Sequence, residues 1–383
     1  MLSFGVARVL RGTASSHGAP GFLMASSRVA SVLVKRGIFL FVALVLIVVL
    51  AAVIIGATGY DKKVLQAIIE GQVRAYKQSL QQKGLPAERI NALVENYTKT
   101  LEHIYGLDRP WYYRVLPLAF RTLTLDLGNV TQNQVAEVVG EQLPLRVSTA
   151  ILEVLPRTII MITIAELVCG IIVLFMGPLI AYRRGSLIDK AAITYAAIMN
   201  ALPVWWLGLI AVFFFGYYLH IAPTRYRDVI YYINNFWSSP LHNLVEIAKY
   251  AWLPMVIVII SFLGSWLYGV RAIALRVVGE DYVAVARAKG LPENLVIRRY
   301  VLRVIAGPAL TIVILGLAGS LGGFIITESV FGWPGMGSLY YAAIMSGDSA
   351  TILGLIYVTT LVYIVARFIL EVLYVWLDPR VKF

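Results

Sequence analysis

The sequence predicts an all-α integral membrane protein, with six transmembrane helices and a large helical extracellular insertion between spans 1 and 2. Its composition gives the first reason, because 59% of the residues are hydrophobic, only 14% are charged and the mean hydropathy is +0.78. Soluble domains average about 25% charged residues. Two further observations support the prediction: six apolar stretches are long enough to cross a bilayer, and the loops between them carry cations in a consistent pattern.

The six apolar stretches define the predicted organisation of the chain. A hydrocarbon core about 30 Å thick requires roughly 20 apolar residues in a helix. Stretches of that length occupy residues 37–58, 158–182, 191–218, 250–274, 301–326 and 352–377. The chain therefore divides into a basic tail (1–36), a first transmembrane helix (37–58), an outer helical domain (59–150) and a membrane core with five spans (151–378), which includes a polar loop (275–300).

The distribution of Lys and Arg predicts that both termini face the cytoplasm, because short cytoplasmic loops carry an excess of these cations. The segments expected on that side are the tail, with Arg8, Arg11, Arg28, Lys35 and Arg36, the loop after the second span, with Arg183, Arg184 and Lys190, and the polar loop, with Arg287, Lys289, Arg298 and Arg299. These cations lie at helix ends and form no basic-aromatic patch. The net charge of +12 therefore indicates membrane orientation rather than binding to nucleic acid.

The segment after the first span is long for a loop and carries two helical stripes. Apolar residues recur at helical spacing over residues 64–80 and again over residues 90–104. Gly84-Leu85-Pro86 between them is a typical helix stop. We expect a helical hairpin on the outer face, closed against itself or against the membrane surface. It either packs as a cap or serves as a docking platform for another protein.

The same segment contains two Asn-x-Ser/Thr sequons, at Asn96 and Asn129. Both fall on the side that the cation pattern assigns to the exterior. Asn96 and Asn129 are therefore candidate glycosylation sites.

The chain lacks the motifs of several enzyme classes. It has no Gly-x-x-x-x-Gly-Lys-Ser/Thr sequence and no Gly-Lys pair, so we expect that it cannot hydrolyse ATP alone. Four His, one Cys and no His-Glu-x-x-His or nucleophile-elbow pattern argue against metal and acyl-transfer chemistry. The single cysteine, Cys169, lies in an apolar run, where packing is its expected role. The sequence predicts a protein that is not an enzyme and binds no cofactor or metal itself.

A polar, Ala-rich block at residues 280–308, between two apolar runs, is the most informative part of the sequence. Ala forms helices well and has a small side chain. Asp281 suits a helix amino terminus, Gly290 suits a helix end with positive φ, and Pro292 suits the first turn of the next helix. The simplest alternative is an ordinary solvated loop with the usual positive residues on the inner side.

The block resembles the coupling loop of ABC transporter permeases, and more narrowly that of the oligopeptide and dipeptide permease branch. The matching residues are Asp281-Tyr282, Ala286-Arg287-Ala288-Lys289-Gly290-Leu291 and Leu302-Arg303. Further matches follow in order at Gly106-Leu107-Asp108-Arg109-Pro110, Asp126-Leu127-Gly128, Leu155-Pro156-Arg157-Thr158, Arg184-Gly185-Ser186-Leu187-Ile188-Asp189, Leu202-Pro203-Val204-Trp205-Trp206-Leu207-Gly208, Gly322-Gly323, Glu328 to Gly337 and Asp378-Pro379-Arg380. The chain departs from the family pattern at Tyr300, Val304 and Gly307-Pro308, and at Arg367 and Glu371 in the last span.

The resemblance implies a permease subunit of an ATP-driven, binding-protein-dependent importer of peptides or a related solute such as oligosaccharides, in the plasma membrane of a prokaryote. The implied partners are a second, non-identical permease subunit, two ABC ATPase subunits that bind ATP and Mg, an extracellular solute-binding protein and the lipid bilayer. A self-sufficient secondary carrier or channel is the alternative, although no repeat relates the two halves of the sequence.

The resemblance also assigns roles to residues of the polar loop. The residues implied to couple to the ATPases are Asp281, Tyr282, Ala286, Arg287, Lys289, Gly290 and Leu291. Among them, we expect Ala286 to face a groove of the ATPase.

Polar residues within or beside the spans are candidates for the translocation path, because such groups are costly in a membrane. The candidates for the path or its gate are Glu166, Asn200, Glu328 and Trp333. Glu166 either lines the path or bonds a neighbouring span, and we expect the segment around Glu328 to form part of the outer gate.

Two further groups of residues in the last two spans have expected packing roles. Arg367 and Glu371 are one helical turn apart and are expected to neutralise each other. Glycines in the fifth span are expected to allow close approach of another backbone, with the partner permease as the favoured neighbour. These glycines are Gly316, Gly319, Gly322 and Gly323.

Overall fold

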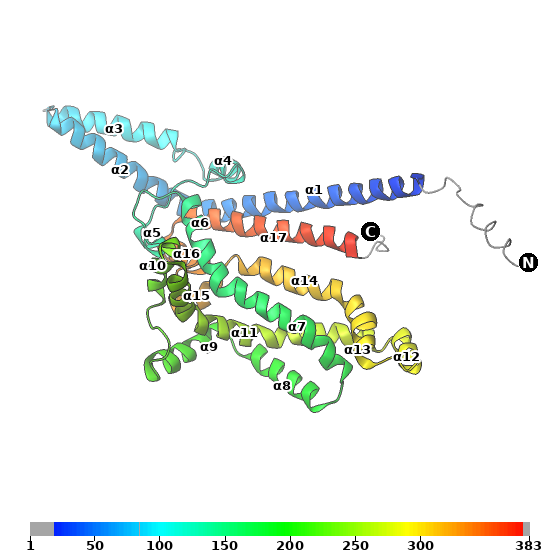
Figure 1. The fold of residues 1–383 in the computed structure, drawn as a ribbon. Coiled ribbons are helices and arrows are strands. Elements are labelled where there is room, and N and C mark those ends of the chain that lie inside the picture. Colours follow the sequence, from blue (N-terminus) through cyan, green and yellow to red (C-terminus); the bar gives the residue numbers. More distant parts are fainter. Residues whose placement is uncertain (1–18, 84, 378–383) are drawn as a thin grey trace, which may run out of the picture.

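The computed structural model describes residues 19–83 and 85–377, which fold almost entirely into helices (Figure 1). Within this part of the chain, the extended pairing is limited to one isolated antiparallel bridge between Asn129 and Arg146. Residues 1–18 of the basic tail, Gly84 and the terminal Asp378-Pro379-Arg380 motif lie outside the described residues. The all-α prediction is confirmed for the described chain.

The helices fall into three groups along the chain. The amino-terminal part contains α1 (Ala19–Thr58), α2 (Tyr60–Gln82), α3 (Ala87–Ile104), α4 (Tyr112–Leu123) and α5 (Asn133–Val139). The middle contains α6 (Val147–Thr158), α7 (Ile164–Tyr182), α8 (Leu187–Ala201), α9 (Val204–Ala211), α10 (Val229–Asn234) and α11 (Pro240–Val278). The carboxyl-terminal part contains α12 (Asp281–Ala288), α13 (Glu293–Leu295), α14 (Leu302–Ser320), α15 (Ile325–Phe331), α16 (Met336–Ser346) and α17 (Ser349–Leu377).

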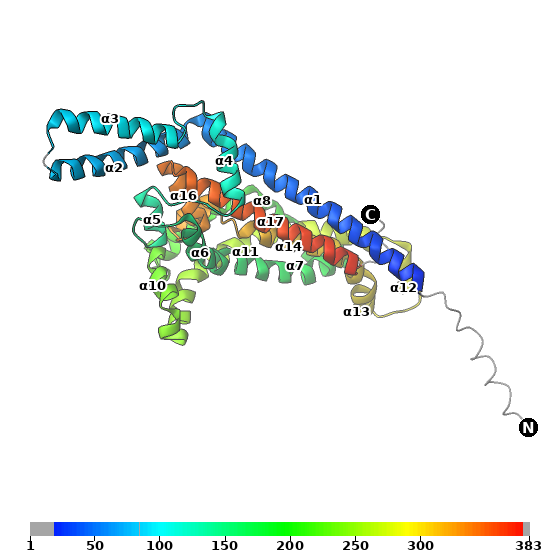
Figure 2. The ribbon, with the colours of Figure 1, turned by 90° about the horizontal axis from the view of Figure 1, so that it is seen from above.

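Five helical segments of the described chain are long and apolar enough to cross a membrane. They are Leu33–Thr58, Val147–Tyr182, Pro240–Val278, Glu293–Ser320 and Ser349–Leu373. In the bundle α1 lies beside α17, and α7 packs against α11 and α14 (Figures 1 and 2). The second segment begins at Val147 rather than near residue 158, because Pro156 does not end the helix. A π-helical turn, Ile159–Thr163, follows this proline and joins α6 to α7.

The third expected span, at residues 191–218, is not one straight helix. The segments Leu187–Ala201 and Val204–Tyr218 meet at an angle of 89°. Pro203 has no N–H to donate and disfavours helical geometry in the residue before it. Leu202 accordingly adopts an extended conformation, with φ −103° and ψ 120°. Counting this bent pair as one span, the described chain has up to six.

The two apolar stripes after the first span form the expected hairpin. Gly59, with a φ of 71°, turns the chain from α1 into α2. α2 and α3 then run side by side away from the bundle (Figures 1 and 2). The rings of Tyr76 and Tyr97 lie 4.4 Å apart between them. The hairpin thus closes against itself, and it projects at the end of the bundle opposite α12 (Figure 1).

Most glycines of the fifth span are in contact within the chain itself. A Cβ added at Gly316 would lie 2.2 Å from the Trp266 ring, and Cβ atoms at Gly322 and Gly323 would also meet neighbouring atoms of this chain. A Cβ at Gly319 would meet no atom of the described chain within 4 Å. Three of the four positions are therefore occupied internally, and Gly319 alone of the four is left open to a partner.

This difference predicts opposite outcomes for two alanine substitutions in one helix. Gly316→Ala should destabilise the chain by about 1 to 3 kcal/mol, because the added methyl group overlaps the Trp266 ring. Gly319→Ala, three residues further along α14, is the matched control and should leave the free energy of unfolding unchanged or slightly increased, because Ala favours helix over Gly. Thermal unfolding of the purified chain in detergent measures both. Equal midpoints for the two variants would contradict the close α11–α14 contact.

Candidate functional site

The polar loop folds as a short capped helix followed by a second helical turn. α12 has Asp281 in its first turn and ends at Ala288. Gly290 has a φ of +71° and donates its N–H to the carbonyl of Arg287 at 2.8 Å. The positive φ expected at Gly290 is therefore confirmed. Pro292 lies directly before α13, where its missing N–H leaves no hydrogen bond unmade.

Ala286 lies on the inner face of α12, which corrects the expectation that it faces an ATPase groove. Its exposed fraction is 2%, and it belongs with Val283 to an apolar cluster that also contains Val296, Val301 and residues of α7, α11 and α14. A helix that packs one face on its own bundle presents the opposite face outward. That outward face carries Val285, which is 52% exposed, with Tyr282 beside it.

Polar contacts also tie α12 to the bundle. Arg287 donates from Nε to the hydroxyl of Tyr182 at 3.1 Å, and its guanidinium lies 4.3 Å from the centroid of that ring. Tyr182 is the last residue of α7. Arg287, one of the implied coupling residues, therefore reaches a membrane span of its own chain, whereas Lys289 and Asp281 are exposed.

An ion pair that the sequence analysis did not predict lies close to α12 and joins α8 to α11. Arg271 donates from Nε and Nη2 to the carboxylate of Asp189, at 2.5 and 2.9 Å. Asp189 also accepts the N–H of Gly185 at 2.9 Å, while Ser186 caps the same helix start. Both charged side chains are largely buried. A cation inside the apolar run at 250–274 was the signal that could have predicted the pair, because an intramembrane charge needs a partner.

Glu328 is fully buried and caps α16 from a different helix. Its Oε2 accepts the N–H groups of Gly337 at 2.9 Å and Ser338 at 3.2 Å, and its Oε1 accepts the Thr158 hydroxyl at 3.1 Å. Thr158 Oγ1 in turn accepts the N–H of Met336 at 2.7 Å. Three donors of the first turn of α16 are thus bonded by side chains from α15 and α6, as the free N–H groups of a helix start require.

Gly335 is the residue that makes room for this arrangement. It is the N-cap of α16 and has no side chain to cap the helix itself. A Cβ at this position would lie 2.4 Å from both Glu328 Oε2 and Thr158 Oγ1. The two capping side chains therefore occupy the space that any other residue at position 335 would fill.

Trp333 and Arg157 extend the contacts around Glu328. Trp333 is fully buried and donates from Nε1 to the carbonyl of Arg157 at 2.9 Å. The Arg157 guanidinium donates to the carbonyls of Val138 at 3.3 Å and Val139 at 2.9 Å, at the end of α5. A cation at a helix carboxyl terminus is favourable. The stretches that begin at Leu155 and at Glu328, far apart in the sequence, therefore form one contact region, which we call the Glu328 hub (Thr158, Glu328, Trp333, Gly335 and Gly337).

The remaining candidates for the path lie apart from the hub. Glu166 is 1% exposed, and its Oε2 has no hydrogen-bond partner among the described residues. Asn200 is exposed near the end of α8, beside the break at Pro203. The structure thus does not gather Glu166, Asn200, Glu328 and Trp333 into one site, and the last two are buried inside the chain.

The expected pair in the last span and the two sequons can also be placed. Arg367 Nη2 lies 3.6 Å from Glu371 Oε1, which confirms the pair, and Arg36 of α1 lies 3.9 Å from the same oxygen. Asn96 of α3 and Asn129 are both exposed.

Burial of the Glu328 hub predicts a pH dependence of stability. Desolvation raises the pKa of Glu328 from 4.5 to about 7, although its hydrogen bonds with Ser338, Thr158 and Gly337 lower it in part. The folded chain therefore binds more protons than the unfolded chain between these values. The contribution of this group to stability is highest below pH 4.5 and falls as the pH rises to about 7.

Glu328→Gln should weaken this pH dependence, because the amide stays neutral and can still accept from the α16 backbone. Thermal unfolding at pH 5 and pH 7 measures the pH dependence of stability. Glu293→Gln changes an exposed carboxylate and is the control, which should keep the wild-type profile. Glu328→Ala should cost about 1 to 3 kcal/mol for each backbone donor left unbonded. Identical pH profiles for wild type and Glu328→Gln would contradict the assignment.

Comparison with known proteins places the site in a family. Residues 167–383 match the family described as "Binding-protein-dependent transport system inner membrane component". This range contains α12 and all of the Glu328 hub except Thr158, whereas the hairpin of α2 and α3 precedes it.

Individual relatives extend the similarity over about three quarters of the chain. The di/tripeptide transport system permease protein DppB of Pseudomonas aeruginosa is 30% identical, covering 73% of this chain and 83% of the relative. The oligopeptide transport system permease protein AppB of Bacillus subtilis is 28% identical with the same coverage, and the metal-staphylopine import system permease protein CntB of Staphylococcus aureus is 25% identical, covering 73% and 80%. The chain belongs to the family of binding-protein-dependent transport system inner membrane components.

Proposed function

We propose that this chain is a permease subunit of an ABC importer and couples ATP hydrolysis by separate ATPase subunits to solute passage. The observation that carries the proposal is the arrangement of α12. Its inner face packs into the cluster shared by α7, α11 and α14, and its outer face exposes Val285 and Tyr282. A short helix of this kind can receive a displacement from a partner and pass it to the spans.

The contacts of α12 explain how such a displacement would spread. Val283 and Ala286 join α12 to the spans by packing, and Arg287 joins it to the end of α7. The buried pair of Asp189 and Arg271 then links α8 to α11. Movement of α12 would therefore tilt the cytoplasmic ends of four helices together, and open or close the path by rigid-body motion.

The proposed assembly has a second, non-identical permease subunit, two ATPase subunits that bind ATP and Mg, and an extracellular solute-binding protein. An open groove of about 400 Å³ lies along α14 and α17 and supports a neighbouring subunit in the membrane. Its lining includes Gly319, Tyr340, Thr359 and Tyr363. The second permease is the proposed occupant of this face.

Peptides are the proposed solutes. The relatives DppB and AppB are named for transport of di/tripeptides and oligopeptides. CntB, named for import of metal-staphylopine, indicates that related chains also serve other solutes. Oligosaccharides remain a second solute class within the proposal. Uptake of labelled dipeptides and oligosaccharides by the reconstituted importer separates the two.

A substitution on the outer face of α12 tests the coupling role. Val285→Glu should leave stability within about 0.5 kcal/mol of wild type, because the side chain is half exposed, yet abolish most solute-stimulated ATP hydrolysis by placing a charge in the ATPase contact. Leu187→Glu is the matched control, since Leu187, the first residue of α8, is 83% exposed. Normal stimulation in Val285→Glu, or equal loss in both variants, would contradict the proposal.

Ala286→Glu should instead destabilise the chain, because it buries a charge.

The proposed orientation, with both termini cytoplasmic, is tested by thiol labelling in intact cells. In a Cys169→Ala background, Asn96→Cys on the hairpin should react with a membrane-impermeant reagent, and Glu293→Cys after α12 should not. Both positions are exposed, so access to the outer medium decides the result. The reverse pattern would invert the orientation.

A further inference from the structure

α4 exposes a row of apolar side chains. Tyr112, Leu116 and Phe120 follow one another at intervals of one helical turn, and their exposed fractions are 56%, 71% and 68%. A neighbouring face of α4 is buried and contains Val115, Ala119 and Thr122. A contiguous exposed apolar row of this kind indicates contact with an apolar environment in the working protein.

The contacts of α4 place it at the depth of the apolar part of α1. Leu118 packs on a cluster formed by Ala51 and Ile55 of α1 and Leu353 of α17. At a rise of 1.5 Å per residue, Ala51 lies about 10 Å inside the end of α1 at Thr58. α4 therefore packs against the spans, whereas the hairpin projects away from them.

The orientation of α4 is crosswise to the spans. Figure 1 shows α4 almost along its own axis beside the outer end of α1, and Figure 2 shows it running across the ends of α1 and α17. α4 contacts both of these helices. An amphipathic helix that lies in the plane of a membrane surface has this orientation.

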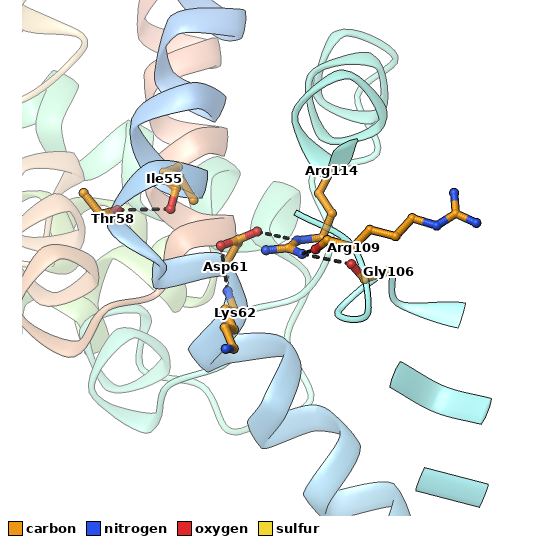
Figure 3. Close-up of polar contacts among 7 residues, drawn as sticks. All are labelled: Ile55, Thr58, Asp61, Lys62, Gly106, Arg109 and Arg114. Carbon is orange, nitrogen blue, oxygen red and sulfur yellow. Dashed lines mark hydrogen bonds and ion pairs between the residues drawn. The ribbon is translucent and has the colours of Figure 1, made fainter. Parts of the chain in front are cut away.

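A polar junction fixes α4 to the start of the hairpin (Figure 3). Arg114 of α4 donates from Nε to Asp61 Oδ2 at 2.7 Å, and its Nη1 donates to the carbonyl of Gly106 at 2.9 Å. Asp61, in the first turn of α2, also accepts the N–H of Lys62 at 2.7 Å. The pair is largely shielded from water. The position of α4 therefore sets the base of the hairpin.

We propose that α4 is an interfacial helix, with Tyr112, Leu116 and Phe120 in contact with lipid at the membrane surface opposite α12. The helix that α4 contacts, α1, also exposes apolar side chains: Leu50 and Ile54 are 60% and 55% exposed in a segment apolar enough to span a membrane. Tyr side chains favour this depth, because the ring is apolar and the hydroxyl reaches water. Through Asp61 and Arg114, lipid contact by α4 anchors the hairpin at a fixed height.

Site-directed spin labelling of the full chain, purified with its associated subunits in phospholipid nanodiscs, tests the proposal. Nitroxides are placed by Leu116→Cys and Phe120→Cys in a Cys169→Ala background, with Leu50→Cys as the lipid reference and Lys99→Cys on exposed α3 as the water reference. The ratio of collision rates with oxygen and with a water-soluble nickel complex should be several-fold higher at both α4 positions than at Lys99→Cys. A ratio equal to that of the water reference would overturn the proposal. Shielding from both reagents would assign the row to a protein partner and overturn it equally.

A pair of charge substitutions tests the junction. Asp61→Asn removes the charge that holds Arg114, so the Phe120 label should become more mobile and its oxygen-to-nickel ratio should fall. Asp126→Asn removes the exposed partner of Arg121, a residue near the carboxyl end of α4, and should change neither quantity. Equal behaviour of the two variants would show that the Asp61–Arg114 pair does not position α4.

Discussion

The capping of α16 by Glu328 and Thr158 is the interaction on which the irregular part of the bundle depends. Between α14 and α16 the chain leaves regular helix twice, and at the second break the backbone donors of Met336 and Gly337 are buried. A buried N–H without a partner is costly, so such turns persist only where side chains bond them. Glu328 and Thr158 supply these bonds, and Gly335 leaves the space for them. α6, α15 and α16 are thereby held as one unit.

A second set of contacts holds the opposite end of the bundle. There α12 is joined to the spans by an apolar cluster and by the contact between Arg287 and Tyr182. Arg271 and Asp189 form a bidentate buried pair that joins α8 to α11. Such a pair is strongly destabilised when one partner is lost, because the other is left as an unpaired charge. These contacts therefore tie α7, α8, α11, α12 and α14 together at this end of the bundle.

The hairpin differs from both ends of the bundle because it has little core of its own. α2 and α3 close on each other, and their mutual contacts include the ring pair of Tyr76 and Tyr97. The height and direction of the hairpin consequently depend on its base, where Gly59 turns the chain and Asp61 bonds Arg114. A membrane-anchored α4 would give this projecting element a fixed reference to the bilayer surface.

The helical class, the apolar spans, the hairpin and the local geometry of Gly290 could all be predicted from the amino-acid sequence. Each of these follows from composition, from residue periodicity or from the backbone freedom of a single residue, which are local properties. Pro203 could have been predicted to break its helix, because a proline acts on its immediate neighbours. Pro156 has the same local preference, yet its helix continues, because a π-helical turn and packed neighbours accommodate it.

The packing of whole helices, in contrast, sets which way side chains face and which distant residues meet. Ala286 lies inward because α12 packs on α7, α11 and α14, and no pattern within eight residues of helix specifies that choice. Thr158 and Glu328 are 170 residues apart in the sequence, and Asp189 and Arg271 are 82 apart. Their hydrogen bonds arise from the packing of whole helices, because the distance between two residues across a bundle is set by the fold and not by their spacing along the chain.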